Sequence, residues 1–224
     1  ARESQRRLSR SNAARTLLYD IAKRAWSDEM CALFRVPKAL LPQTSACDAH
    51  FGDADASLFG RSIPIHGMAG DQQAALVGHG CFKPGTAKCT FGTGAFLVMN
   101  MGDAPPHSKN RLLGTVGYHA DGKFAYALEG SIFSAGATMQ WLRDGLKLIR
   151  NSAESEAIAR GLEGNGGVYL VPAFAGLGAP QWNADARGTI VGLTRDSRLE
   201  HLVRAGLEAV AYQTADLLDA LRAD

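Results

Sequence analysis

The sequence has 224 residues, and 46% of them are hydrophobic, enough to bury the core of one large domain or of parts of two. Lysine and arginine number 24 against 22 for aspartate and glutamate, so charge gives no reason to expect a nucleic acid or an acidic membrane as partner. No apolar run approaches the roughly 18 residues that a membrane helix needs, and no signal peptide opens the sequence. We therefore expect a soluble globular protein.

The cysteines and histidines show no spacing typical of a disulfide framework or a metal site. The four cysteines form no CxxC pair and no Asn-x-Ser/Thr triplet occurs, which favours a reducing, cytoplasmic location. The six histidines are isolated, so we expect no metal held by these side chains. We expect His66 to be a satisfied core group. The arginines near the N-terminus are expected to form a solvated chain end: Arg2, Arg6, Arg7 and Arg10.

The first third of the sequence predicts short elements around one apolar run. Ser27-Asp28-Glu29 predicts the start of a helix toward Phe34. The polar residues 48–60 predict a surface loop, and the apolar run 63–69 predicts a buried strand. Residues 72–77 then predict a short helix, with Gly70 or Asp71 as its N-cap.

The middle of the sequence is rich in β-type patterns. The dipeptide Asp121-Gly122 is a strong signal for a hairpin. The expected strands are residues 86–91, 95–100, 112–119 and 123–128.

The last third predicts helices separated by short strands. Apolar residues at spacings of three and four predict a helix over 131–149, and Asn151 with Glu154 resembles the capping box of a second one that ends at the glycines 164–167. Two further runs predict strands, at 168–174 and 188–193. The longest helix is expected to be capped by Ser197 with Glu200, and its buried stripe contains Leu202, Ala205, Ala209, Gln213, Leu217 and Leu221. This order of elements fits an α/β layered domain.

Asp71 is the first candidate for chemistry. An aspartate between a strand and a helix is more often a cap than a catalyst. However, Gln72 and Gln73 follow directly, and a carboxylate flanked by carboxamides can bind several hydroxyls of a polyol.

The second candidate is the turn Gly92-Thr93-Gly94, whose glycines would let backbone N–H groups approach an anion. Taken alone, this turn is more typical of a simple hairpin. A further run of small residues, 135–137, would allow a nucleotide to approach the following helix. The three features together indicate phosphoryl transfer.

Several segments resemble the FGGY carbohydrate kinase family of the actin-like ATPase superfamily, and among its branches the one that phosphorylates glycerol. They are GMAGDQQAALVG, CTFGTGAFLVMN, YALEGSIFSAGATMQWLRDGLKLI, GVYLVPAFAGLGAPQW and ARGTIVGLTR. The resemblance implies a truncated α/β chain of the actin-like ATPase (ribonuclease H-like) fold. Residues 1–75 would complete the first, substrate-side domain, and residues 76–224 would form most of the second, nucleotide-side domain.

The resemblance also implies roles for individual residues. Asp71 would be the general base that takes a proton from glycerol as glycerol attacks the γ-phosphate of ATP bound to Mg²⁺. Gln72 would bind the glycerol hydroxyls, and Phe96 would pack on the carbon chain. Gly92, Thr93 and Gly94 would contact the phosphates of ATP, with Gly136 and Gln140 near the ribose or the α-phosphate. Each also has a plain structural interpretation: an exposed first-turn residue for Gln72, a core aromatic for Phe96 and a packing glycine for Gly136.

The family pattern is incomplete in this sequence. Its N-terminal phosphate loop, the Arg-Glu pair of the glycerol pocket and the C-terminal glycine-rich adenine segment are absent. We therefore expect a central fragment of a longer kinase that is inactive by itself. The likeness leaves a dimer or tetramer open for the full-length protein. Two other interpretations remain: a kinase for another polyol or sugar, and a non-catalytic actin-like binding module.

Overall fold

A four-stranded sheet occupies the middle of the sequence in the computed structural model, which describes residues 6–224. Its strands are β7 (Ala87–Phe91), β8 (Ala95–Gly102), β9 (Leu113–Ala120) and β10 (Lys123–Ile132), in the order β7-β8-β10-β9. β9 and β10 are antiparallel, with Lys123 opposite Ala120. Asp121 and Gly122 between them have φ values of +51° and +68°, as a two-residue hairpin turn with left-handed residues requires. The predicted hairpin is confirmed.

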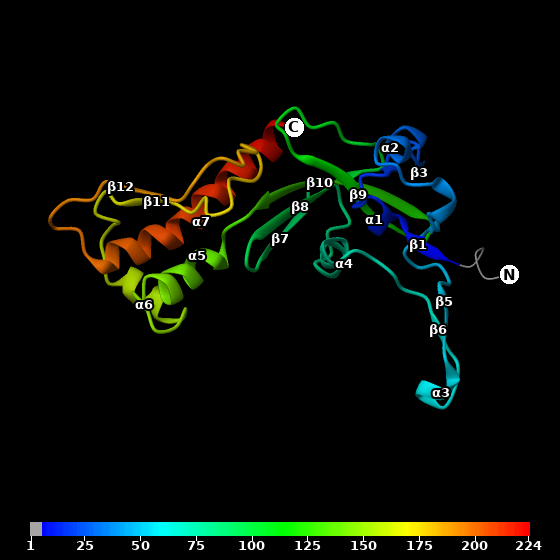
Figure 1. Cartoon of the computed structure of the whole chain (residues 1–224), viewed down its shortest axis with the longest axis horizontal. Coiled ribbons are helices and arrows are strands. Elements are labelled where there is room, and N and C mark those ends of the chain that lie inside the picture. The colour runs from blue at the N-terminus through cyan, green and yellow to red at the C-terminus, as the bar shows by residue number, and fades with distance from the viewer. Residues whose placement is uncertain (1–5) are drawn as a thin grey trace. The chain divides into compact units, whose positions relative to one another are not determined.

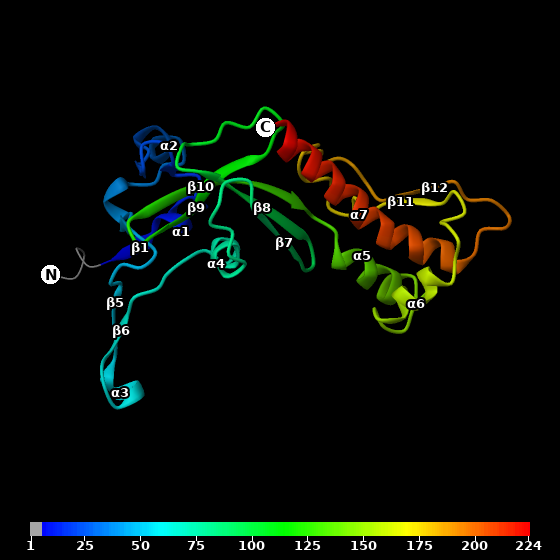
Figure 2. The same ribbon diagram turned by 180° about the vertical axis from the view of Figure 1, so that it is seen from behind.

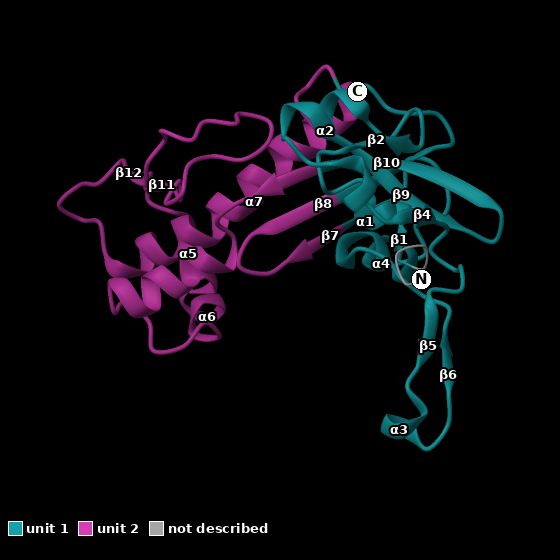
Figure 3. Ribbon diagram, turned by 45° about the vertical axis from the view of Figure 1, so that its right-hand side comes forward, with its two compact units in different colours: residues 1–88, 98–108, 113–129 teal, residues 89–97, 109–112, 130–224 magenta. Residues whose placement is uncertain are grey.

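The chain divides into two compact units, coloured separately in Figure 3. Unit 1 contains residues 1–88, 98–108 and 113–129, and unit 2 contains residues 89–97, 109–112 and 130–224. Three strands of the sheet, β7, β8 and β10, contribute residues to both units.

Short elements surround the sheet residues of unit 1 (Figure 1). β1 (Arg7–Ser9) pairs in parallel with β4 (Gln43–Ser45), and β2 (Tyr19–Asp20) pairs antiparallel with β3 (Ala25–Trp26). The helices are α1 (Arg10–Ala13), α2 (Asp28–Leu33), α3 (Ala56–Phe59) and α4 (Asp71–Gly78), with a 3-10 turn at Lys38–Leu40. Ser27 Oγ accepts from the Met30 backbone N–H at 3.2 Å, so the predicted start of α2 is confirmed.

The prediction of a buried strand over 63–69 is wrong. Only Ile63–Ile65 is a strand, β6, and Ile63 and Ile65 are 37% and 44% exposed. β6 pairs with β5 (Gly52–Ala54) in a hairpin that projects from the rest of unit 1 and carries α3 at its tip (Figures 1 and 2). Because no layer of the described residues 6–224 covers the hairpin, Ile63 and Ile65 stay exposed although their apolar pattern predicts burial. The expected surface loop at 48–60 therefore includes β5 and α3.

Two smaller expectations in unit 1 are wrong in whole or in part. His66 is exposed and lies against the ring of His50, with 5.1 Å between centroids, rather than in the core. The expected solvated end is confirmed for Arg6 and Arg7, which are exposed, but not for Arg10, which is partly buried at the start of α1. Arg2 lies outside the described residues.

Unit 2 is built on a long helix, α7 (Leu199–Ala223), as Figure 2 shows. It packs on the antiparallel pair β11 (Tyr169–Val171) and β12 (Thr189–Val191) and on α6 (Glu154–Arg160). The predicted stripe of α7 is confirmed at the positions that are buried: Ala205, Ala209, Leu217 and Leu221.

The continuous helix predicted over 131–149 is wrong. β10 extends to Ile132, helix α5 covers only Gly136–Gln140, and a π-helix follows at Trp141–Gly145. Ile132, Met139, Leu142 and Ile149 are all buried, so the apolar spacing indicated burial correctly. It did not distinguish a strand end followed by short helical turns from one long helix.

Two helices begin a few residues later than the sequence predicts. α6 begins at Glu154 rather than near Asn151, although Asn151 Oδ1 does accept from the Glu154 N–H at 3.2 Å, and it ends at Arg160, before the glycine cluster. α7 begins after Arg198, whose N–H donates to His201 Nδ1 at 3.0 Å. Ser197 does not cap it, because its Oγ accepts from the Thr194 N–H.

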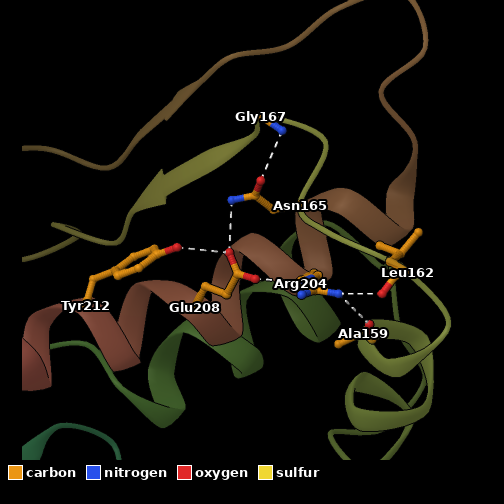
Figure 4. Close-up of polar contacts among 7 residues, drawn as sticks. All are labelled: Ala159, Leu162, Asn165, Gly167, Arg204, Glu208 and Tyr212. Atoms are coloured by element: carbon orange, nitrogen blue, oxygen red, sulfur yellow. Dashed lines mark hydrogen bonds and ion pairs between the residues drawn. The ribbon is translucent and has the colours of Figure 1, made fainter.

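A polar network ties the loop after α6 to α7 (Figure 4). The Glu208 carboxylate accepts from Arg204 Nε at 2.8 Å, Asn165 Nδ2 at 2.9 Å and the Tyr212 hydroxyl at 3.2 Å. Arg204 Nη1 also donates to the Leu162 carbonyl at 2.6 Å. An arginine and carboxylate that share several partners fix a loop more firmly than an isolated surface pair does.

In the described part of the chain, no helix combines the length and the apolar character needed to cross a bilayer.

His119 makes the stability of unit 1 depend on pH. Burial, together with the nearby Arg10 guanidinium, lowers the pKa of His119. Arg10 Nη1 lies 2.7 Å from His119 Nδ1, and since a guanidinium can only donate, the ring accepts there and is neutral. A group with a lowered folded pKa contributes stability above its unfolded value of about 6.5, and this stability is lost as pH falls through the folded pKa.

We therefore expect the free energy of unfolding to fall between pH 7.5 and 5, and His119→Asn, which accepts but does not protonate, to flatten that fall. Urea titrations followed by circular dichroism at each pH would measure it. His107→Asn, at an exposed histidine of the same unit, is the control. Equal slopes for the wild type and His119→Asn would contradict the prediction.

Candidate active site

The N-terminus of helix α4 is held in place on unit 1 by its own residues. Gly70 is the N-cap, and its backbone N–H donates to Ser11 Oγ at 3.2 Å. Leu76, one and a half turns further on, is fully buried in a cluster with Val98 and Ala127. The helix start is thereby fixed at both sides of Asp71, which is its first residue. Of the two predicted caps, Gly70 is the one observed.

The Asp71 carboxylate is exposed and bound by Gln72. The Gln72 backbone N–H donates to Asp71 Oδ1 at 2.8 Å, and Gln72 Nε2 donates to Asp71 Oδ2 at 3.1 Å. The free backbone N–H groups of a helix N-terminus also favour a negative charge there. A solvent-accessible carboxylate with fixed orientation can accept a proton from a bound hydroxyl.

The two glutamines after Asp71 have different environments. Gln73 is 2% exposed and its amide donates to Thr115 Oγ1 at 3.4 Å, so it belongs to the interior of unit 1. The expectation that both amides flank the carboxylate is wrong for this residue. Because side chains one residue apart on a helix are about 100° apart, Gln72 and Gln73 cannot share a face.

Sequence reasoning missed Lys88 of β7. Its ammonium contacts Gln72 Oε1, and the residue is 3% exposed. In the sequence, Lys88 is only a lysine within a β-type pattern. Such a lysine is equally typical of an exposed edge strand, so the pattern does not predict a buried ammonium.

The turn 92–94 lies in unit 2 and docks on the start of α5. The Gly92 N–H donates to the Gly94 carbonyl at 2.8 Å, and the Thr93 carbonyl accepts from the N–H groups of Ala135 and Ala137 at 2.9 and 3.0 Å. A Cβ at Gly94 would overlap the carbonyl oxygen of Ile132. The glycine therefore allows the turn to approach the end of β10 closely.

Gly136 and Gln140 lie at the two ends of α5. The Gly136 N–H donates to the Gly92 carbonyl at 2.9 Å, and a Cβ at Gly136 would lie 2.5 Å from that oxygen. Gln140 is exposed, and Phe96, on β8, is half-buried. The structure thus brings together Gly92, Thr93, Gly94 and Gly136 in unit 2, and Asp71 with Gln72 in unit 1.

An apolar groove of about 570 Å³ adjoins this turn in unit 2. Gly92, Gly136 and Met139 line one side, and α7 lines the other with Leu207, Val210, Ala211 and Thr214. A groove of this size with apolar walls fits a flat, weakly polar group such as a nucleobase.

The described residues contain no cluster of three or more His, Cys, Asp or Glu side chains that could hold a metal ion. Mg²⁺ usually keeps several waters and binds through substrate phosphates with one or two carboxylates. Such binding does not require a cluster of three protein side chains.

Models of one family match almost the whole chain. The N-terminal domain model of the FGGY family of carbohydrate kinases matches residues 7–78, and the C-terminal domain model matches residues 87–224. The chain belongs to the FGGY family of carbohydrate kinases.

Among curated relatives, this FGGY chain is 57% identical over 218 residues to "Glycerol kinase 1" of Pseudomonas aeruginosa. It is 58% identical over 214 residues to "Glycerol kinase" of Alcanivorax borkumensis. These matches cover 97% and 96% of the chain but 44% and 43% of the relatives. The chain therefore spans less than half the length of the proteins that it resembles.

Solved structures show the same fold. The crystal structure of Plasmodium falciparum glycerol kinase with ADP matches with a TM-score of 0.87 and 40% identity, covering 97% of this chain and 44% of that one. A xylulose kinase from Lactobacillus acidophilus matches with a TM-score of 0.81 over 96% of this chain and 44% of that one, but its 22% identity supports the fold alone. The FGGY chain has the actin-like ATPase fold of these sugar kinases.

Proposed function

We propose that the full-length protein containing this chain transfers the γ-phosphoryl group of ATP to glycerol and forms sn-glycerol 3-phosphate. The observation that carries the proposal is the exposed Asp71 carboxylate at the start of α4, oriented by Gln72. It occurs in a chain 57% identical to a curated glycerol kinase over nearly its whole length.

In the proposed mechanism, Asp71 takes the proton of the glycerol 3-hydroxyl as that oxygen forms its bond to the γ-phosphorus. The bond from phosphorus to the bridging oxygen breaks, and ADP leaves. Gln72 orients the hydroxyls, and Phe96 packs against the carbon chain. A positioned base contributes roughly 10² to 10⁴ in rate, so the rest comes from alignment and from charge stabilisation of the phosphoryl group.

We assign the nucleotide to the turn and groove of unit 2. The Gly92 N–H is already bonded to the Gly94 carbonyl, so Thr93 and Gly94 are better placed than Gly92 to donate to phosphate oxygens. Gly136 and Gln140 would lie near the ribose or the α-phosphate. ATP would bind as its Mg²⁺ complex, in which the ion would supply positive charge beside the phosphates.

The division into domains follows from the same proposal. Residues 1–75 would complete the substrate-side domain and residues 76–224 would form most of the nucleotide-side domain. The matched ranges of the two family models, 7–78 and 87–224, support a division in this stretch. We place the protein in the cytoplasm, a reducing compartment in which free cysteines persist. Whether it forms a dimer or a tetramer would be read from light scattering of the full-length protein.

The test is a coupled assay of ADP release by the purified full-length protein, with glycerol, xylulose and gluconate as acceptors. We expect ATP-dependent formation of glycerol 3-phosphate and a much higher kcat/KM for glycerol than for the two sugars. A higher kcat/KM for xylulose or gluconate would identify that compound, and not glycerol, as the substrate. If none of the three acceptors is phosphorylated but another polyol is, that polyol is the substrate. If no acceptor is phosphorylated under any condition, the non-catalytic module is favoured.

A further inference from the structure

Lys88 is a charged side chain almost completely removed from solvent. It lies near the start of β7 and is 3% exposed. Lysine is rarely buried to this degree unless its ammonium is paired or hydrogen-bonded, because removing the charge from water is unfavourable. A buried ammonium beside a candidate active site therefore requires an explanation beyond packing.

The ammonium of Lys88 is connected to the Asp71 carboxylate by two hydrogen bonds through the Gln72 amide. Its Nζ donates to Gln72 Oε1, and Gln72 Nε2 donates to Asp71 Oδ2 at 3.1 Å. The three side chains form a hydrogen-bonded chain from β7 to the start of α4, and all three residues belong to unit 1.

Only one orientation of the Gln72 amide is consistent with both hydrogen bonds. An ammonium can only donate, so the Gln72 carbonyl oxygen must face Lys88. The Gln72 NH₂ group then faces the Asp71 carboxylate, which can only accept when it is ionised. If the amide rotated by half a turn, its oxygen would face the carboxylate and its NH₂ group would face the ammonium, and both contacts would be lost. Lys88 therefore selects one of the two amide orientations.

We propose that Lys88 is a positioning residue for substrate binding, which holds the Gln72 amide with its N–H groups directed at Asp71 and at the hydroxyls of the acceptor. The inference rests on the proposed function of Asp71 and Gln72. One amide hydrogen bonds to Asp71, and the other can donate to a hydroxyl oxygen of a polyol. Since Lys88 acts through Gln72, its loss weakens the binding of substrate more than the chemical step.

The first experiment measures glycerol kinetics of the full-length protein with Lys88→Met, which keeps the length of the side chain and removes its charge. We expect KM for glycerol to rise about tenfold or more, as loss of a hydrogen bond to a charged group predicts, and kcat to change by less than about threefold. Lys83→Met, at an exposed lysine five residues earlier, is the matched control and should leave both constants unchanged. The proposal would be overturned if Lys88→Met left KM unchanged, or if the variant lowered kcat about tenfold without raising KM.

A double-mutant cycle tests whether Lys88 acts through Gln72. The variant with both Lys88→Met and Gln72→Ala should bind glycerol no more weakly than Gln72→Ala alone, because the group that Lys88 orients is already gone. Additive effects on KM would show that Lys88 acts by another route. Should Lys88→Met not fold, Lys88→Gln takes its place in the cycle, with the same direction of change expected.

The last measurement needs no turnover. In protein labelled with ¹⁵N, the Gln72 side-chain NH₂ protons should exchange with water more slowly in the wild type than in Lys88→Met, because the amide is held at both ends. Slow exchange in the wild type without any kinase activity would retain Lys88 as an anchor of Gln72 and reject the proposed function. Equal exchange rates in both proteins would reject the role of Lys88 even if the kinase is active.

Discussion

Asp71→Asn in the full-length protein should lower kcat for glycerol phosphorylation by about 10² to 10⁴, the contribution of a positioned general base. Asparagine has the same shape and keeps an oxygen that can accept from the Gln72 N–H, so the start of α4 should be preserved. KM for glycerol should change less than kcat, because the variant loses proton transfer and keeps the backbone contact, although asparagine Nδ2 cannot accept from Gln72 Nε2. Steady-state kinetics by ADP release would measure both constants.

The control for this variant is Asp103→Asn, at an exposed aspartate of the same unit that the proposal does not use. Thermal unfolding of both variants would verify that the fold is intact. Turnover of Asp71→Asn within a factor of about three of the wild type would exclude Asp71 as the base. The aspartate would then be a residue that only stabilises the helix start, which is the more common role at this place.

Arg15→Met should destabilise unit 1 by about 3 kcal/mol, near the lower end of the range for breaking a buried ion pair. Arg15 Nη2 lies 2.8 Å from Glu129 Oε1, and the Glu129 side chain is 1% exposed. Removing the guanidinium leaves a negative charge in the interior of β10 without this partner. We use the lower end because the Arg15 side chain is 39% exposed, and water screens its charge. Urea unfolding followed by circular dichroism would measure the loss.

A second substitution distinguishes the buried charge from simple packing. Glu129→Gln added to Arg15→Met should recover part of the stability, since a neutral amide is less unfavourable in the interior than a carboxylate that has lost its guanidinium partner. Arg61→Met, at an exposed arginine of the same unit, should change stability by less than about 0.5 kcal/mol. No recovery in the double variant would show that Arg15 stabilises the unit through its aliphatic stem.

These predictions depend on side-chain partners that only the structure reveals, whereas much of the local structure follows from nearby residues. The Asp121-Gly122 hairpin depends on two residues that adopt left-handed conformations easily, and the start of α2 depends on a serine and the N–H three residues later. Both interactions span a few residues, so a sequence pattern predicts them. The buried stripe of α7 is predictable for the same reason, because one face of a regular helix repeats every three to four residues.

The errors occur where burial depends on elements far away in the sequence. The apolar run at 63–69 resembles a core strand, yet β6 pairs with β5 in a projecting two-stranded hairpin whose isoleucines are exposed. The run over 131–149 has helical spacing, but its first two residues complete β10, a strand that lies between β8 and β9 in the sheet. Apolar residues spaced three to four apart indicate which positions are buried, but this spacing does not indicate which neighbouring element buries them.

For the candidate site, the sequence by itself determined the family and the residues that its motifs carry, Asp71, Gln72 and the turn 92–94, because these motifs are short and contiguous. Only the tertiary structure decided that Gln73 faces the interior and that Lys88, sixteen residues after Gln72, contacts the Gln72 amide. That contact joins a strand to a helix start, and no local pattern encodes it. The physical reason is general: propensity and spacing act along the chain, whereas the pairing of a buried charge depends on which segments fold against each other.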